Sequence, residues 1–159
     1  ESNKYYTPEI KEFHVGFEYE IKEESGKLDV NRTNYKLEWI KQIFTFEEFL
    51  EYSFEPQNNY FKIHLEQNMF RVKYLDQEDI ESLGWIFRKT YDEGVAYKKN
   101  NHILFHNIKK NYITIIIEDP SRDKEMMFKM ILNEVYMINI KNKSELKKLL
   151  KQLNIYDSQ

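Results

Sequence analysis

The chain has 159 residues, enough for one domain with its own core or for two very small ones. It contains no Cys, which excludes disulfides, thiolate metal sites and a Cys nucleophile. Its formal net charge is only −3, with 10 Lys+Arg against 14 Asp+Glu in residues 1–75 and 14 against 13 in residues 76–159, so composition alone predicts neither a polyanionic nor a strongly basic partner.

The first half of the chain reads mainly as strand. Apolar and polar residues alternate from Phe13 to Lys22 and from about Asn34 to Phe44, which predicts two half-buried strands. A turn at Ser25-Gly26-Lys27 makes them a hairpin with a long connection. The remaining elements expected here are a third short helix near 46–52 capped by Thr45, and two short strands at Tyr60–Leu65 and Phe70–Tyr74.

Two capped helices are the clearest elements of the sequence, at about 76–83 and 142–153. Asp76 and Gly84 have the chemistry of an N-cap and a left-handed C-terminal residue. Asn142 and Glu145 are spaced as a capping box, and Asn154 can end the second helix while Ile155 packs back onto its last turn. Leucines lie on one face of that helix at i, i+3, i+4 and i+7, namely Leu146, Leu149, Leu150 and Leu153.

Between these helices the sequence predicts an antiparallel meander. The expected strands are Trp85–Tyr91, Gly94–Lys98, Asn101–Ile108 and Tyr112–Glu118, followed by Met126–Ile140 as one bulged strand or a hairpin. The fold class is therefore α+β, mostly antiparallel sheet covered by short helices. We expect a single compact domain, 1–159, with two β-rich subdomains, 1–75 and 76–159, as the alternative.

Three blocks of the sequence carry a resemblance. They are YYTPEIKEFHVGFEYE (Tyr5–Glu20), RVKYLDQEDIESLGW (Arg71–Trp85) and IKNKSELKKLLKQLNI (Ile140–Ile155). The chain resembles small proteins of unknown function encoded by bacteriophages and prophages, in which the blocks recur in this order. The resemblance implies a phage origin and a role in host takeover, counter-defence or the virion. It implies no activity and no catalytic residues.

The first predicted strand carries the only carboxylate pattern worth weighing as a catalytic site. Glu18, Glu20 and Lys22 share one face with His14, and Glu20-Ile21-Lys22 has the E-x-K form seen in many metal-dependent nucleases. Two carboxylates and a Lys can hold Mg²⁺ and polarise a phosphate. Any amphipathic strand in a chain that is 32% charged also gives this pattern, so we interpret the residues as a solvated sheet face.

His102 and His106 would form a metal pair only on a helix. Their neighbours Ile103, Leu104 and Phe105 favour a strand, on which four residues span about 13 Å. We therefore predict no metal site and no cofactor.

Basic and aromatic residues are interleaved around this strand, in the manner of single-strand nucleic-acid binders. The residues concerned are Lys98, Lys99, Lys109, Lys110, Tyr97 and Tyr112. The simpler interpretation is that lysines flank hairpin ends for solubility while the tyrosines fill the core. The lysines of the last helix, Lys141, Lys143, Lys147, Lys148 and Lys151, are interpreted as a solvated helix face.

No catalytic constellation emerges from these patterns, whereas an aromatic-rich β surface suits partner binding. The leading hypothesis is a non-enzymatic, phage-encoded interaction protein that binds a protein partner in the host cytoplasm. We expect no membrane span, and a homo-oligomer is compatible with this function. The alternatives are a nucleic-acid or nucleotide-binding module and a small metal-dependent nuclease.

Overall fold

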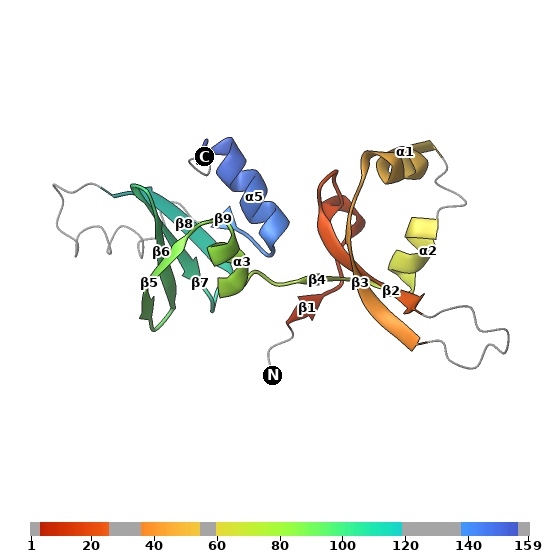
Figure 1. Cartoon of the computed structure of the whole chain (residues 1–159), viewed down its shortest axis with the longest axis horizontal. Helices are drawn as coiled ribbons and strands as arrows, with labels where there is room; N and C mark the ends of the chain where they lie inside the picture. The colour runs from red at the N-terminus through yellow and green to blue at the C-terminus, as the bar shows by residue number, and fades with distance from the viewer. Residues whose placement is uncertain (1–3, 26–35, 55–59, 119–137, 156–159) are drawn as a thin grey trace. The chain divides into compact units, whose positions relative to one another are not determined.

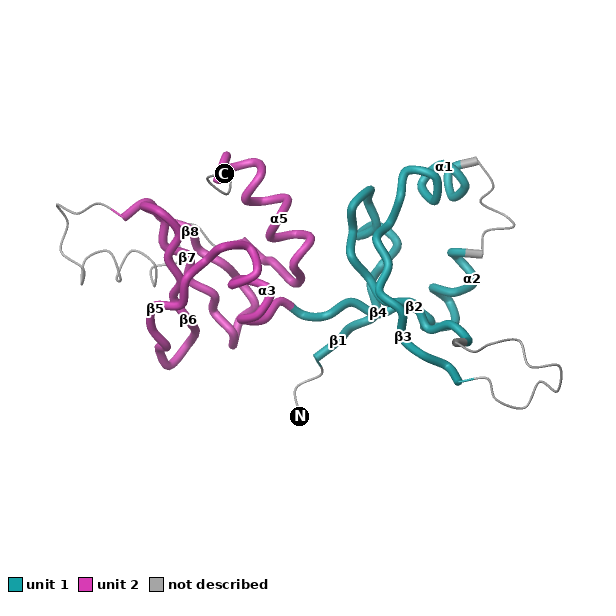
Figure 2. The backbone as a smooth tube through the Cα atoms, viewed as in Figure 1, with its two compact units in different colours: residues 1–74 teal, residues 75–159 magenta. Residues whose placement is uncertain are grey.

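The computed structural model describes residues 4–25, 36–54, 60–118 and 138–155, which form an α+β fold with two antiparallel sheets (Figure 1). The predicted fold class is confirmed. The chain divides into two compact units, residues 1–74 and 75–159, coloured separately in Figure 2. Whether these units act as one domain or as two subdomains stays a prediction, and each is described by itself below.

Unit 1 is built on a four-stranded sheet in the order β1-β4-β2-β3. Its longest pairing joins β2 (Glu18–Ser25) to β3 (Lys36–Ile43), in an unbroken antiparallel register from Glu18 opposite Ile43 to Ser25 opposite Lys36. The predicted antiparallel pairing of these strands is confirmed, while the predicted turn residues Gly26 and Lys27 lie outside the described part of the chain. The sheet is completed by β4 (Phe70–Lys73) and β1 (Tyr5–Tyr6).

The first predicted strand begins later than the sequence pattern indicates. Residues Ile10–Glu12 form a 3-10 helix, η1, and a turn follows in which the Phe17 amide donates to the His14 carbonyl. Gly16 adopts a φ of +90°, a conformation that glycine reaches without steric cost and that no strand residue uses. The apolar alternation over residues 13–17 thus reflects the inward packing of Phe13 and Phe17, and the prediction of strand there was wrong.

The predicted strand Tyr60–Leu65 is also wrong, because the segment Tyr60–Glu66 is the helix α2. Phe61 and Leu65 are one helical turn apart, and both pack against the aromatic core of the unit. The predicted third helix is confirmed as α1 (Phe46–Phe54). Thr45 and Glu48 form a capping box at its start, with the Glu48 amide donating to Thr45 Oγ1 at 3.2 Å and the Thr45 amide to Glu48 Oε2 at 2.6 Å.

Aromatic rings dominate the core of unit 1. Phe13 lies at its centre, with ring centroids 4.5 Å from Phe61 and 4.9 Å from Phe17, and both pairs are tilted or edge-on. The buried members of the cluster come from β2, from β4, and from the residues just before β2 and just after β3, namely Phe17, Tyr19, Ile21, Phe44, Phe70 and Val72. On this side of the sheet, β2 and β4 bury their apolar side chains in the core, whereas β3 contributes the partly buried Ile40 between the exposed Glu38 and Gln42.

Unit 2 is an antiparallel meander in the order β5-β6-β7-β8-β9, as predicted. The strands are β5 (Ile86–Tyr91), β6 (Gly94–Lys99), β7 (His102–Asn107), β8 (Tyr112–Ile117) and β9 (Ile138–Asn139). Asn100 and Asn111 take positive φ values of 52° and 56° in the connecting turns, where Asn is tolerated best after Gly. Most of the predicted element at Met126–Ile140 lies outside the described residues.

The two predicted helices are confirmed, with the caps that the sequence indicates. Asp76 Oδ1 accepts from the Asp79 amide at 3.0 Å at the start of α3 (Gln77–Ser82), and Gly84 follows it with a φ of +81°. Asn142 Oδ1 accepts from the Glu145 amide at 2.9 Å at the start of α5 (Lys143–Gln152).

The end of α5 is a complete Schellman motif. The Ile155 amide donates to the Leu150 carbonyl at 2.9 Å, and the Asn154 amide donates to the Lys151 carbonyl at 3.2 Å. Asn154 has a φ of +55° and Ile155 is buried in the core, as predicted.

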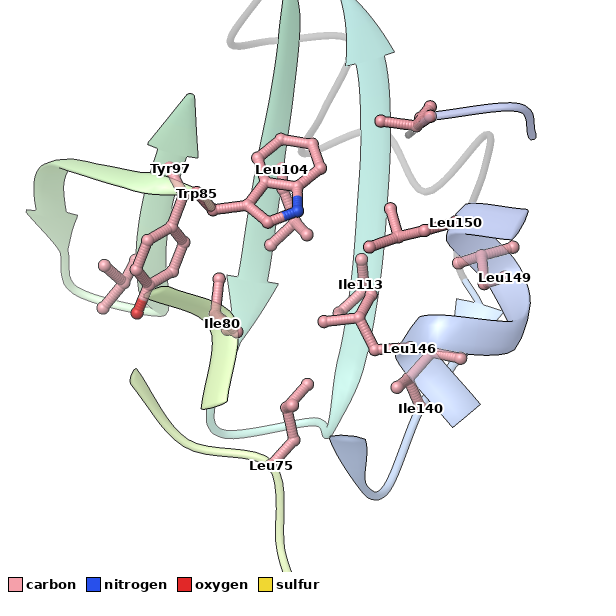
Figure 3. Close-up of a cluster of buried hydrophobic side chains, with 12 residues drawn as sticks. Leu75, Ile80, Trp85, Tyr97, Leu104, Ile113, Ile140, Leu146, Leu149 and Leu150 are labelled. Atoms are coloured by element: carbon pink, nitrogen blue, oxygen red, sulfur yellow. The ribbon is translucent and has the colours of Figure 1, made fainter. Parts of the chain in front are cut away.

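Helix α5 covers one face of the meander through its leucines. Leu146, Leu149 and Leu150 belong to the same buried cluster as Ile113, and Figure 3 shows Leu150 directed at the strand that carries Ile113. Lys147, Lys148 and Lys151 lie off this leucine face, and Lys148 and Lys151 are exposed. None of the helices in the described ranges is long and apolar enough to cross a membrane.

Candidate interaction surface on the unit 1 sheet

The face of the unit 1 sheet opposite its core carries a compact group of charged and aromatic side chains. On β2, Tyr19 and Ile21 point into the core, so Glu20 and Lys22 point away from it. The register places Arg71 of β4 opposite Glu20 and Trp39 of β3 opposite Lys22. Together with Tyr5 of β1, these residues form what we call the Arg71 face: Tyr5, Glu20, Lys22, Trp39 and Arg71.

The Arg71 side chain is held on three sides. Its Nε donates to Glu20 Oε2 at 2.6 Å, and the guanidinium carbon lies 3.9 Å from the ring centroid of Tyr5 and 4.2 Å from that of Trp39. The Lys22 ammonium lies 5.9 Å from the Trp39 ring. The Arg71 side chain is 27% exposed and that of Glu20 14% exposed. The ion pair and both cation–π contacts are therefore partly shielded from water, and each is stronger than the same contact would be at a fully exposed site.

These contacts correct the interpretation of Glu20 as part of a solvated sheet face. The carboxylate is largely covered and bonded to Arg71, because β4 lies beside β2 in the sheet. His14 is not on this face either; it lies in the turn before β2, where its Nδ1 is 2.9 Å from the Glu12 carbonyl oxygen. Within the described residues, no three or more His, Asp or Glu side chains are close enough together to hold a metal ion.

The tyrosines of the predicted nucleic-acid surface are inside unit 2. Tyr97 is only 1% exposed, and burial raises the pKa of its hydroxyl to about 12. Tyr112 is also buried, and its hydroxyl accepts from Asn107 Nδ2 at 3.2 Å. A stacked base needs an open ring face, which neither side chain offers in this conformation.

The four lysines of that set have separate surroundings. Lys98 is ion-paired with Glu118, and the buried Lys99 donates from Nζ to the Leu83 carbonyl at the end of α3 at 2.8 Å. This bond satisfies one of the carbonyls that every helix leaves without an intrahelical partner. Lys109 and Lys110 are exposed in the turn between β7 and β8. The nucleic-acid hypothesis stays a prediction, carried by these exposed lysines without the tyrosines.

His102 and His106 lie on β7, so the predicted strand is confirmed. His106 is buried within unit 2, and its Nε2 makes no hydrogen bond within the described residues. Burial lowers the pKa of this imidazole below its ordinary 6.5, and the Asp76 carboxylate opposes the shift only in part.

This burial predicts a pH dependence of stability. Because the folded-state pKa of His106 is depressed, the unfolded chain binds more protons between that value and 6.5, and stability is lost as the pH falls through this interval. We expect His106→Gln to flatten the dependence of unfolding free energy on pH just below 6.5, as measured by denaturant unfolding. His14→Gln in unit 1 is the control. If His106→Gln left the dependence of unfolding free energy on pH unchanged, His106 would not be the source of that dependence.

The residues of the Arg71 face were not singled out as a group from the sequence. Glu20 and Arg71 are 51 positions apart, and only the strand order brings them together. The signal in the sequence is local: Arg71 lies between the apolar residues Phe70 and Val72, so one face of this strand had to be polar.

Compared with protein-family models, curated proteins and solved structures, the chain gives no match to any of the three.

Proposed function

We propose that the chain is a non-enzymatic binding protein whose Arg71 face contacts a protein partner. The observation that carries the proposal is the guanidinium of Arg71 fixed between the rings of Tyr5 and Trp39. The resemblance to phage and prophage proteins leads us to propose a phage origin, action in the bacterial cytoplasm and a role in host takeover, counter-defence or the virion.

The composition of this face supports binding. Trp, Tyr and Arg are the residue types that most often dominate the energy of protein interfaces. Arg71 is already held by Glu20 and two rings, so a partner would immobilise few additional rotamers. On the same side of β3, Leu37 is 52% exposed and Ile43 58% exposed, which adds apolar area beside the charged centre.

The experiment is quantitative capture of proteins from nuclease-treated bacterial lysate on immobilised wild-type chain and variants. We expect Arg71→Ala and Trp39→Ala to weaken capture of the same partner by at least about thirtyfold, equivalent to the loss of a hot spot worth about 2 kcal/mol. Arg88→Ala, at an exposed position of β5 in unit 2, is the matched control and should bind as wild type. Circular dichroism of each variant, compared with wild type, checks that the substitution does not unfold the chain.

Equal capture by wild type and both face variants would contradict the proposal. The nucleic-acid alternative is tested in parallel by anisotropy of a labelled single strand. Binding through exposed lysines alone is mostly counterion release and should vanish near physiological salt. Tight binding that persists there would favour the nucleic-acid function instead.

A further inference from the structure

Strand β3 is an eight-residue edge of the unit 1 sheet. Its pairing with β2 is continuous, with no bulge and no proline. The other edges among the described strands differ. β1 and β9 have two residues each, and β5 has a register shift at Phe87/Lys89. Bulges and short lengths are two of the means that keep an edge from pairing, and β3 is the edge among the described strands that has neither, although it does carry charged side chains.

The backbone groups that β3 turns outward can be identified from its neighbours. The Phe44 amide donates to the Phe17 carbonyl, and the Phe44 carbonyl accepts from the Gly16 amide, so Phe44 faces β2. Such groups alternate along an antiparallel strand. Independently, the Lys22 amide donates to the Met69 carbonyl and so points away from β3. Trp39 lies opposite Lys22, so the backbone N–H and C=O of Trp39 point away from β2. The outward residues are therefore Leu37, Trp39, Lys41 and Ile43.

The same four residues place their side chains on the Arg71 side of the sheet. Leu37 and Ile43 are more than half exposed, and Lys41 is exposed without an ion pair among the described residues. The edge thus presents, in order, apolar, aromatic, cationic and apolar positions. This order is complementary to itself when read in the opposite direction.

We propose that β3 pairs antiparallel with β3 of a second copy of this chain, about a two-fold axis at Ile40. Leu37 then lies opposite the partner subunit's Ile43, and Trp39 lies opposite the partner subunit's Lys41. All four outward residues form hydrogen-bonded pairs, each of which exchanges two N–H···O bonds. Ile40 lies opposite Ile40 of the partner subunit in a pair without hydrogen bonds. Such an interface is isologous and closes after two copies.

Charge and strand length favour this register over its neighbours. A shift of two residues in one direction sets Lys41 opposite the partner subunit's Lys41, which is repulsive; a shift in the other direction sets Leu37 opposite the partner subunit's Lys41 and leaves Ile43 opposite no residue of the described strand Lys36–Ile43. A shift of one residue turns the hydrogen-bonding groups away from each other and moves the side chains to opposite faces. In the proposed register the stem of Lys41 packs beside an indole ring. The other lysine of the strand, Lys36, forms an ion pair within the strand, with its Nζ 3.2 Å from Glu38 Oε1.

The test uses the absence of Cys from the chain. Opposed residues in a pair without hydrogen bonds have Cα atoms about 4.5 Å apart, within the range that a disulfide bridges. Ile40→Cys should therefore give a covalent dimer when pure protein is oxidised with glutathione disulfide. Gln42→Cys is the matched control, because Gln42 faces Glu38 of the partner subunit and should cross-link at least about tenfold more slowly.

A second measurement does not depend on oxidation. Ile43→Lys should weaken the dimer at least about tenfold in sedimentation equilibrium, whereas Ile86→Lys on β5, which is 70% exposed, should not. Faster cross-linking of Gln42→Cys, equal cross-linking of both variants, or a wild-type chain that stays monomeric at high concentration would overturn the proposal. All measurements use the pure chain, so their failure is distinct from failure to bind a protein partner.

Discussion

Leu146→Ala is expected to lower the free energy of unfolding of unit 2 by about 2–5 kcal/mol. Leu146 is 0% exposed and lies where α5 meets the meander, beside Ile113 and Ile140 (Figure 3). Truncation removes its apolar contacts and leaves a cavity that the surrounding structure fills only in part. Lys148→Ala, at an exposed position of the same helix, should change stability by less than about 0.5 kcal/mol.

The two tryptophans make this measurement specific for each unit, since Trp39 lies in unit 1 and Trp85 in unit 2. Denaturant unfolding in a Trp39→Phe background follows Trp85 alone, and the Trp85→Phe background follows Trp39. A Trp85 midpoint unchanged by Leu146→Ala would show that α5 contributes little to the core. If the Trp39 midpoint shifts equally, the chain unfolds as one domain; if it stays, the units are subdomains.

Gly94→Ala is expected to destabilise unit 2 by about 3 kcal/mol, at the upper end for an overpacked site. A Cβ at this position would lie 2.1 Å from the His106 carbonyl oxygen and 2.9 Å from the Asn107 Cα. Both atoms are backbone of β7, so no side-chain rotation relieves the overlap. The β6–β7 pairing must separate locally, and hydrogen bonds of the ladder are lost with it.

Gly16→Ala is the comparison for this substitution. Gly16 has a φ of +90°, and a Cβ added there would meet no atom within 4 Å. Only backbone strain of about 1–2 kcal/mol is therefore expected, and it destabilises unit 1. Denaturant unfolding followed by Trp85 measures the first substitution, and Trp39 the second. A loss for Gly94→Ala no larger than that for Gly16→Ala would contradict the steric argument.

Elements whose determinants lie within a few residues were predictable from the sequence. Thr45, Asp76 and Asn142 each cap a helix through a backbone amide three residues ahead, and that spacing is visible in the sequence. Asn154 ends the last helix for an equally local reason, its tolerance of positive φ.

Elements decided by packing were not predictable in the same way. The apolar residues of the short segment Tyr60–Leu65 are compatible with either a strand or a helix. The segment is a helix because this conformation lets Phe61 and Leu65 reach the aromatic core together. The tyrosines Tyr97 and Tyr112 occupy strands as expected, but alternation alone does not say which sheet face a helix will cover. The Arg71 face likewise depends on strand order, because β4 inserts beside β2 from far along the chain.

The boundary between the units falls within one dipeptide. The Tyr74 amide donates to the Lys4 carbonyl, whereas the amide of the next residue, Leu75, donates to the Lys141 carbonyl. A hydrogen-bonded amide exchanges its proton with solvent only when its bond opens. The exchange rates of these two adjacent amides therefore report separately on the opening of the β1 edge and on the opening of the chain that enters α5.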